Sequence, residues 1–362
     1  MKDRSKHDLE ALRAVDPRVP VQRRAVAPQP GDLAVPALVG SQRRTEEGGA
    51  PGHGGQARQD DAGRWGPPRA DIDRGTAVLA AAAFAVALGA QVLLFGLSLT
   101  PDRYLLVLLA PAVVLGRGRR FMLDFVPFVV LIVLYEECRG IAHNLHPQPF
   151  YAPQLDAEKA LFLGHVPSVD LQDWLWTGQL HWYDQFLSAM TRIHFIVPPT
   201  LAFLLWLRRR ALFYRFAATL LVLSYAGAFT FWLFPAAPPW AASEKGLIPY
   251  LANPAGVQAA TSPLPTDSGP VYHLVDGNPY AAVPSLHGGY SLLVFLWVAM
   301  LAWSTRYRWW VVVPAAAYPV IQTVAVVYTA NHYVVDLLIG FVYAVAAVYG
   351  VRRFWRWRGW PE

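Results

Sequence analysis

The sequence is short of the residues on which many enzyme sites and small folds depend. It holds a single cysteine, Cys138, which excludes an intramolecular disulfide and a cysteine-based zinc site. Only 15% of its 362 residues are charged, and because there are just four lysines, the net charge of +6 comes almost entirely from arginine. The chain contains no internal repeat, no glycine-rich nucleotide loop and no nucleophile elbow. These absences exclude a disulfide scaffold, a repeat array and the common nucleotide-binding and serine-hydrolase sites.

Apolar and aromatic residues dominate instead. Hydrophobic residues make up 54% of the chain, which has 14 tryptophans and a mean hydropathy of +0.28. Soluble domains rarely combine such values, whereas multi-span membrane proteins do so routinely. The arginines fall in short runs between apolar stretches, which is typical of membrane orientation rather than of a nucleic-acid surface. We therefore predict a membrane protein that does not bind nucleic acid.

Eight apolar runs predict an all-α polytopic membrane protein with about eight transmembrane helices. The runs are Thr76–Leu99, Tyr104–Leu115, Phe121–Tyr135, Ile193–Leu207, Ala211–Phe234, Leu286–Trp303, Trp309–Tyr328 and Tyr333–Val351. A helix needs about 20 residues to cross about 30 Å of hydrocarbon, so the second, third and fourth runs are short. They either borrow flanking residues, or the second and third form a hairpin that does not fully cross. Both alternatives leave the sidedness of the later helices unchanged.

The arginine clusters predict which loops face the cytoplasm. They occur in alternate loops, on the same side as the arginine-rich N-terminus, at 117–120, 208–210, 304–308 and 352–358. By the positive-inside rule this side is cytoplasmic, so we expect both termini inside. The remaining loops, at 100–103, 136–192, 235–285 and 328–332, are then extracytoplasmic. The sequence thus predicts a multi-pass protein of the cell membrane.

Composition divides the chain into four parts. Residues 1–75 are rich in arginine, proline and glycine and nearly free of aromatics, so we expect a disordered cytoplasmic tail. This tail either touches anionic headgroups or is a dispensable extension. Residues 76–120 are expected to form accessory transmembrane helices, and 353–362 a cytoplasmic tail. The core, 121–352, includes an interfacial segment at 140–192, rich in Trp and Leu but too polar to span, and the proline-rich extracytoplasmic loop 235–285.

The stretch YTANHYVVDLLIGF, residues 328–341, carries two ionisable groups at the outer end of the last helix. His332 and Asp336 are spaced i, i+4 and therefore share one helix face. A carboxylate there can accept the Nδ1–H of the imidazole, which leaves Nε2 as a nucleophile. An isolated membrane histidine is more often a packing residue, but intramembrane ionisable groups are functional by default. This pair is a candidate catalytic site.

A second histidine motif, AAVPSLHGGYSLL, begins the sixth helix at the same membrane depth. Ser285 is a suitable N-cap for this helix, and Gly288 leaves its first turn open to close approach. The free N–H groups and the positive dipole end of such a helix form an anion site. Together with His287, these features indicate phosphoryl transfer through a phosphohistidine.

The two motifs, PSLHGGYS and YTANHYVVDLLIG, resemble the second and third motifs of the type 2 phosphatidic acid phosphatase superfamily. They are more narrowly similar to the branch containing fungal inositol phosphorylceramide synthase, as is the upstream LFPAAPPWAA at 233–242. The resemblance covers roughly residues 120–350. It implies a six-helix phosphatase-type core in which His332 is the nucleophile, Asp336 orients it and His287 protonates the leaving group. No cofactor or metal is implied.

The sequence departs from the superfamily in its phosphate-binding cations. The first motif, a lysine with an Arg-Pro seven residues on, is absent, and Val326 stands where many members have an arginine. The inositol-phosphotransferase branch shares the second departure. Arg139 is the best substitute, with Arg192 and Lys245 as weaker ones; the alternative for Arg139 is an interfacial arginine that only snorkels. We expect the phosphate to be bound by Arg139, Ser285 and Gly288.

Three classes of function remain open. The first is a membrane phosphatase or phosphotransferase that acts on a lipid phosphate or phosphodiester at the outer face, including transfer of an inositol-phosphate type headgroup with a polyol as acceptor. Its simpler form is a lipid-phosphate or isoprenyl-pyrophosphate phosphatase. The second is a lipid or solute transporter, but transporters place ionisable residues near the midplane, not at one face. The third is a lipid-binding protein with a vestigial site. Retention of both histidines and the aspartate favours the enzyme.

Overall fold

The computed structural model describes residues 72–96, 100–145, 148–254, 256–257 and 278–360. All of them belong to one compact unit that begins at residue 53. Most of the predicted tail 1–75, and the 258–277 part of the predicted loop 235–285, lie outside the described residues.

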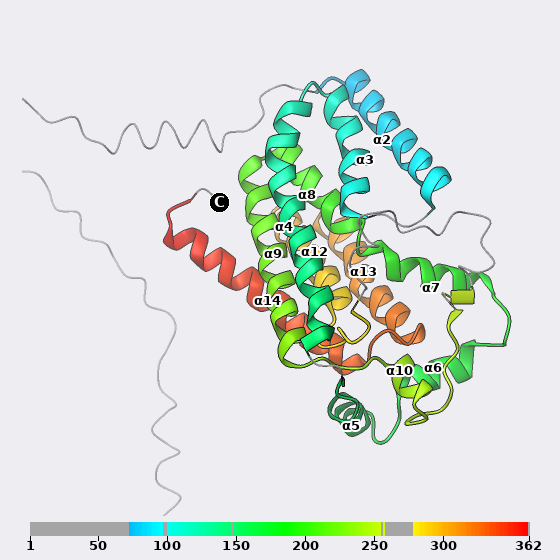
Figure 1. Ribbon diagram of the computed structural model, residues 1–362. Coiled ribbons are helices and arrows are strands. Elements are labelled where there is room, and N and C mark those ends of the chain that lie inside the picture. Colours follow the sequence, from blue (N-terminus) through cyan, green and yellow to red (C-terminus); the bar gives the residue numbers. More distant parts are fainter. Residues whose placement is uncertain (1–71, 97–99, 146–147, 255, 258–277, 361–362) are drawn as a thin grey trace, which may run out of the picture. The chain divides into compact units, whose positions relative to one another are not determined.

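The described residues form twelve helices and no β-strand, which confirms the predicted all-α class (Figure 1). The helices are α2 (Arg74–Phe95), α3 (Pro101–Val114), α4 (Gly118–Leu145), α5 (Ala152–Leu161), α6 (Pro167–Leu175), α7 (Trp182–Ile193), α8 (Val197–Arg208), α9 (Arg210–Leu233), α10 (Pro239–Glu244), α12 (Leu286–Ala302), α13 (Arg308–Tyr328) and α14 (Val334–Trp357). Each of the eight predicted apolar runs falls within or largely overlaps one of these helices, and the predicted outer segment 140–192 folds into short helices between them.

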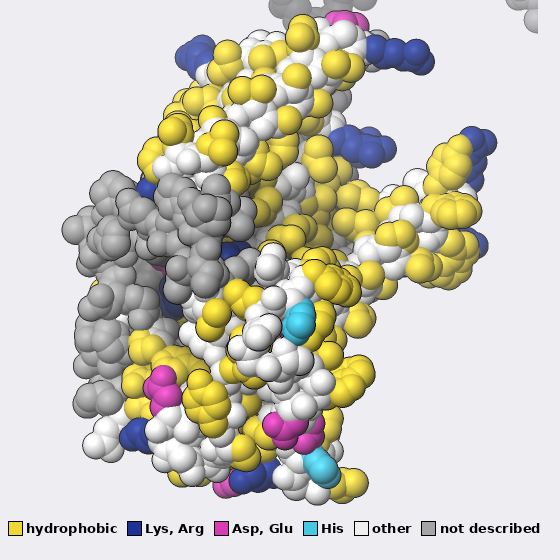
Figure 2. All heavy atoms as spheres, turned by 90° about the vertical axis from the view of Figure 1, so that its right-hand side faces the viewer, with side chains coloured by type: hydrophobic (Ala, Val, Ile, Leu, Met, Phe, Trp, Pro, Cys, Tyr) yellow, Lys and Arg dark blue, Asp and Glu magenta, His cyan; other side chains and the backbone are white. Residues whose placement is uncertain are grey.

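The apolar helices make this a multi-pass membrane protein. Among the described helices, α2, α9, α13 and α14 are long and apolar enough to cross a membrane, and the bent pair α7–α8 is a fifth candidate. Helices α3 and α12 are apolar but shorter. Hydrophobic side chains cover most of the face shown in Figure 2, while histidine and most acidic side chains lie in its lower half. This distribution suits a bundle whose sides meet lipid and whose ends meet water.

The largest apolar core lies among α3, α4, α8, α9, α12 and α14. Aromatic rings from three helices meet in it: Phe125 of α4 stacks on Phe213 of α9 with centroids 4.5 Å apart, and Trp206 of α8 contacts both Phe121 and Phe125 edge-on. Such ring pairs favour offset or edge-to-face geometry, which fixes the relative rotation of the helices that carry them.

One end of this core is closed by a buried carboxylate. Asp124 of α4 is 4% exposed and accepts hydrogen bonds from the Trp206 indole, the Tyr214 hydroxyl and the Arg210 guanidinium. Arg210 belongs to the 208–210 arginine cluster, so this is the end that the sequence assigns to the cytoplasm. A buried charge with several donors is tolerated because its lost hydration is replaced.

At the opposite end, α12 and α14 cross without room for side chains. A Cβ on Gly340 of α14 would collide with the carbonyl of Ser285, and a Cβ on Gly288 would lie 2.8 Å from Cδ2 of Leu337. A Cβ on Gly289 would also lie close to the carbonyl oxygen of Gly340. The glycines of the second motif therefore serve a close helix crossing, and this crossing brings the first turns of the two helices together.

Short helices cover the same end of the bundle. Glu158 of α5 is fully buried, and its two carboxylate oxygens accept from the N–H groups of Val334 and Val335, each at 3.0 Å. Gln172 of α6 donates to the carbonyls of Tyr328 and Ala252. These buried hydrogen bonds tie the outer helices to the first turn of α14 and to the end of α13.

We predict that Glu158→Ala destabilises the protein by about 2–4 kcal/mol, because it leaves two buried N–H groups of α14 without acceptors. The midpoint of thermal denaturation in detergent measures this loss. Asp156→Ala, at an exposed position of the same helix, is the matched control and should leave the midpoint unchanged. Equal midpoints for the two variants would show that Glu158 does not anchor α14.

Candidate active site

His332 lies in the loop just before α14 and is 5% exposed. The loop is held by the Val326 carbonyl, which accepts from the N–H groups of Asn331 and His332. Nδ1 of His332 is 3.1 Å from the Ala282 carbonyl oxygen, which can only accept a hydrogen bond. Nδ1 therefore carries the proton, and Nε2 presents a lone pair.

His287 lies in the first turn of α12 and faces this lone pair. Its Nδ1 is 3.0 Å from Nε2 of His332, and the ring centroids are 5.0 Å apart. Because Nε2 of His332 has no proton in this tautomer, Nδ1 of His287 is the donor. The structure thus brings together the two histidines that the sequence separates by 45 residues, with one N–H directed at the second ring's nucleophilic nitrogen.

Asp336 is close to His332 but is engaged differently from the sequence expectation. Its Oδ2 lies 3.6 Å from Nδ1 of His332, too long for a hydrogen bond, and accepts from the Tyr333 N–H at 2.9 Å. Asp336 is fully buried, and Oδ1 has no hydrogen-bond partner among the described residues. The Ala282 carbonyl, not the carboxylate, holds Nδ1 because Asp336 caps the first turn of its own helix.

Ser285 and Gly288 form the N-terminal cap of α12. The Ser285 hydroxyl accepts from the Gly288 N–H at 3.3 Å, as the sequence predicts for an N-cap. The Ser285 N–H donates to the backbone carbonyl of Asp336 at 2.9 Å, which links the two motifs directly. The N–H of Gly288 is therefore used within the helix cap, and the predicted phosphate contacts of both residues remain predictions.

The N-terminus of α14 is already satisfied by carboxylates. Glu158 accepts from two N–H groups of its first turn, and Asp336 accepts from a third. Carboxylates near a helix N-terminus stabilise its partial positive charge. The N-terminal N–H groups of α14 are therefore already bound by carboxylates and cannot bind an incoming anion. The first turn of α12 instead carries a histidine and two glycines.

Arg139 lies on the last turns of α4, on the same side as the histidines. It forms an ion pair with Glu136 at 2.8 Å, and its side chain is 24% exposed. Its charge acts on both His194 and His287, so it lies within electrostatic range of the histidine pair. Of the weaker candidates, Lys245 lies over the Tyr151 ring at 4.9 Å, and Arg192 is half-buried in α7.

A third histidine adjoins the pair, and sequence reasoning did not assign it to the site. His194 follows α7, is 7% exposed and contacts His287, with ring centroids 3.9 Å apart and the ring planes tilted by 55°. Its Nδ1 donates to the Thr191 carbonyl at 2.6 Å. It lies at the start of the predicted apolar run Ile193–Leu207, but no spacing in the sequence connects it with the other two histidines.

Burial governs the protonation of His332. Loss of hydration lowers its pKa to about 4, and the hydrogen bond to the Ala282 carbonyl opposes this shift only in part. The imidazole is therefore neutral at physiological pH, as a nucleophile must be. Among the described residues, no group of three His, Cys, Asp or Glu side chains could hold a metal ion. The side chains of His143 and His146 lie outside the described part.

Comparison with known proteins places this geometry in a family. The sequence profile of the PAP2 superfamily matches residues 155–350, which include both histidine motifs. A phosphoinositol dihydroceramide synthase of Bacteroides thetaiotaomicron is 26% identical over 256 residues, covering 65% of this chain and 81% of the relative. No solved structure shows a significant match. The profile match spans more than half of the chain, so this protein belongs to the PAP2 superfamily and is a phosphatase or phosphotransferase of that superfamily.

Proposed function

We propose that the protein transfers the phosphate-bearing headgroup of a membrane lipid through a phosphohistidine on His332, at the extracytoplasmic face. One observation carries this proposal: the neutral His332 has a lone pair on Nε2, and the Nδ1–H donor of His287 lies 3.0 Å from that nitrogen. A nucleophile and a proton donor at this separation are the two groups that displacement at phosphorus requires.

In the first step, Nε2 of His332 attacks phosphorus and a P–N bond forms. The bond from phosphorus to the lipid alcohol oxygen breaks, and His287 gives its Nδ1 proton to that oxygen. The positive charge that develops on the His332 ring lies 3.6 Å from the Asp336 carboxylate, which stabilises it. His287 must turn its N–H from Nε2 to the leaving oxygen, since phosphorus takes the place of that hydrogen bond.

In the second step, an acceptor attacks the phosphohistidine. His287 removes the acceptor's proton, an O–P bond forms, and the P–N bond breaks. Water as acceptor gives a phosphatase, and an alcohol gives a transferase. The name of the Bacteroides relative supports an inositol-phosphate headgroup with a lipid alcohol as acceptor; a polyol acceptor and simple hydrolysis are the alternatives. Incubation with labelled phosphatidylinositol and ceramide, or with labelled phosphatidic acid and inositol, distinguishes them.

Helix positions support the proposed sidedness. Both histidines lie at the end of the bundle opposite to the Asp124–Arg210 pair, and thus away from the arginine-rich loops. Exposed tryptophans of the 140–192 segment, Trp174 and Trp182, lie at the catalytic end, where an interfacial belt is expected.

The first prediction of this proposal concerns the phosphohistidine. His332→Ala should abolish turnover, because no other group can replace a covalently modified nucleophile. Asp336→Asn should lower turnover by about 10²- to 10³-fold, because it removes the carboxylate 3.6 Å from the ring that stabilises the developing positive charge. An acid-labile, base-stable phosphate trapped during turnover should map to His332. His165→Ala, at an exposed outer histidine, is the control and should keep full activity. Trapped phosphate on His287, or half-maximal activity in His332→Ala, would contradict the assigned roles.

The second prediction concerns Arg139. If its charge neutralises the transferring phosphate, Arg139→Ala should lower kcat by about 10²-fold. Glu136→Gln removes only the partner of the ion pair and should keep most of the activity. Arg192→Ala is the matched arginine control and should have a smaller effect than Arg139→Ala. Equal losses in Arg139→Ala and Glu136→Gln would instead mean that the ion pair has a structural role.

The third prediction concerns sidedness. In a variant without Cys138, a cysteine at the exposed Asp156 of α5 should react with an impermeant maleimide on intact cells. A cysteine at Ser304, in the exposed loop between α12 and α13, should react only after lysis. The reverse pattern would place the histidines on the cytoplasmic side.

A further inference from the structure

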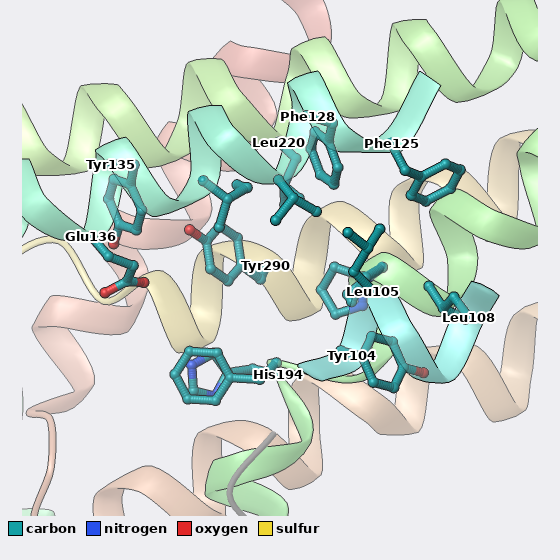
Figure 3. Close-up of a pocket in the computed structure, with 15 residues that line it drawn as sticks. Tyr104, Leu105, Leu108, Phe125, Phe128, Tyr135, Glu136, His194, Leu220 and Tyr290 are labelled. Carbon is teal, nitrogen blue, oxygen red and sulfur yellow. The ribbon is translucent and has the colours of Figure 1, made fainter. Parts of the chain in front are cut away.

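A narrow cavity lies between α3, α4, the start of α8 and the first turns of α12. Figure 3 shows Glu136 and His194 at one end of it, and Phe125 and Leu108 at the other. The cavity is lined by Tyr104, Leu105, Leu108, Phe125, Phe128, Val129, Ile132, Tyr135, Glu136, His194, Phe195, Pro198, Pro199, Leu220 and Tyr290. Its volume is about 80 Å³.

The chemistry of the lining changes along the cavity. Glu136, His194 and Tyr290 supply polar groups at one end. The opposite end is formed by phenylalanine and leucine side chains together with Tyr104, whose hydroxyl is hydrogen-bonded to Thr200. Ligand sites commonly combine such an apolar body with a few polar groups at one place. An apolar cavity with polar groups at one end suits a hydrocarbon chain attached to a polar headgroup.

The polar end of the cavity adjoins the proposed catalytic pair. His194 forms part of the wall and contacts His287 with ring centroids 3.9 Å apart, while His287 in turn contacts His332. Glu136 also lines the cavity and is paired with Arg139, whose charge reaches His287. A headgroup phosphate bound at the histidines would therefore place its lipid chain beside the polar end of this cavity.

The cavity is open toward the side of the bundle. Leu105 and Pro199 line it and are half-buried, and Phe195 is 39% exposed, which indicates an opening between α3 and the start of α8. In a membrane these surfaces contact lipid chains. Tyr104 and Thr200 join the two helices by a hydrogen bond of 2.5 Å between their hydroxyl groups.

The walls of the cavity come from two different parts of the chain. His194, Leu220 and Tyr290 belong to the region that the superfamily profile matches, residues 155–350. Helices α3 and α4 lie before that region. They supply Tyr104 and the eight lining residues from Leu105 to Glu136. The apolar wall therefore comes mostly from helices that precede the region matched by the profile.

We propose that this cavity binds a hydrocarbon chain of the lipid whose phosphate is transferred, and that α3 and α4 thereby select among lipids by chain shape and length. The proposal rests on the proposed function for the identity of the reacting lipid. A lipid chain in a bilayer is already in an apolar medium, so its selection depends on packing in the slot rather than on the hydrophobic effect. The effect is on KM and chain preference, not on the chemical step.

Photo-crosslinking tests the proposal without requiring turnover. The probe is phosphatidic acid with a diazirine near the end of one oleoyl-length chain, added to the purified full-length protein in detergent. We expect crosslinks to concentrate on the α3 and α4 residues that line the cavity. Leu105→Trp should fill the slot and reduce these crosslinks by about fivefold or more. Leu106→Trp, the neighbouring exposed position on the same helix, is the matched control and should leave them unchanged.

Crosslinks spread over the lipid-facing surface and insensitive to Leu105→Trp would overturn the proposal. If Leu105→Trp fails to fold, Val129→Trp blocks the same slot from α4. Turnover provides a separate readout: Leu105→Trp should raise KM for dioleoyl-phosphatidic acid several-fold and leave p-nitrophenyl phosphate hydrolysis intact. If the wild-type protein gives the expected crosslinks but forms no phosphohistidine, only the proposed function is contradicted. If it forms the phosphohistidine but its crosslinks do not concentrate on the cavity, only the cavity assignment is contradicted.

Discussion

The close crossing of α12 and α14 is the constraint on which the site depends. Glycines at the contact let the carbonyl of Ser285 approach Gly340 and let Gly288 lie against Leu337, so the first turns of both helices share one small volume. The Ser285 N–H then reaches the Asp336 carbonyl, and His287 reaches His332. A side chain at either contact would separate the helices, and the two imidazoles would lose their hydrogen bond. The close approach of the two backbones, rather than any single charged pair, therefore positions His287 beside His332.

Sequence patterns predicted the helices well because each of the eight apolar runs coincides with a helix. They predicted complete membrane crossings less well, since only four described helices, or five with the bent pair α7–α8, are long and apolar enough to cross. The N-cap at Ser285 and the nearness of His332 to Asp336 follow from local spacing, which the chain alone determines. The meeting of His287 and His332 was inferred only from membrane depth and family resemblance. Spacing within one helix is local information, but contact between helices depends on packing.

Features that arise from packing escaped prediction. No pattern marks the Ala282 carbonyl as the partner of His332, because any residue supplies the same backbone oxygen. His194 stands 93 residues before His287 and 138 before His332, and only the folded bundle brings its ring to 3.9 Å from His287. We expected Asp336 to accept the hydrogen bond from Nδ1 of His332, but the Ala282 carbonyl lies nearer to that atom. The Asp336 carboxylate instead accepts from the Tyr333 N–H and caps its own helix.

The carboxylate of Glu158 has a consequence for the motions of the protein. Its hydrogen bonds to Val334 and Val335 join α5 to the helix that follows His332. Both N–H groups would lose their acceptors if α5 moved away. Helix α5 is therefore fixed to the start of α14. A displacement of α5 would have to break both of these buried hydrogen bonds, which lie two and three residues after His332.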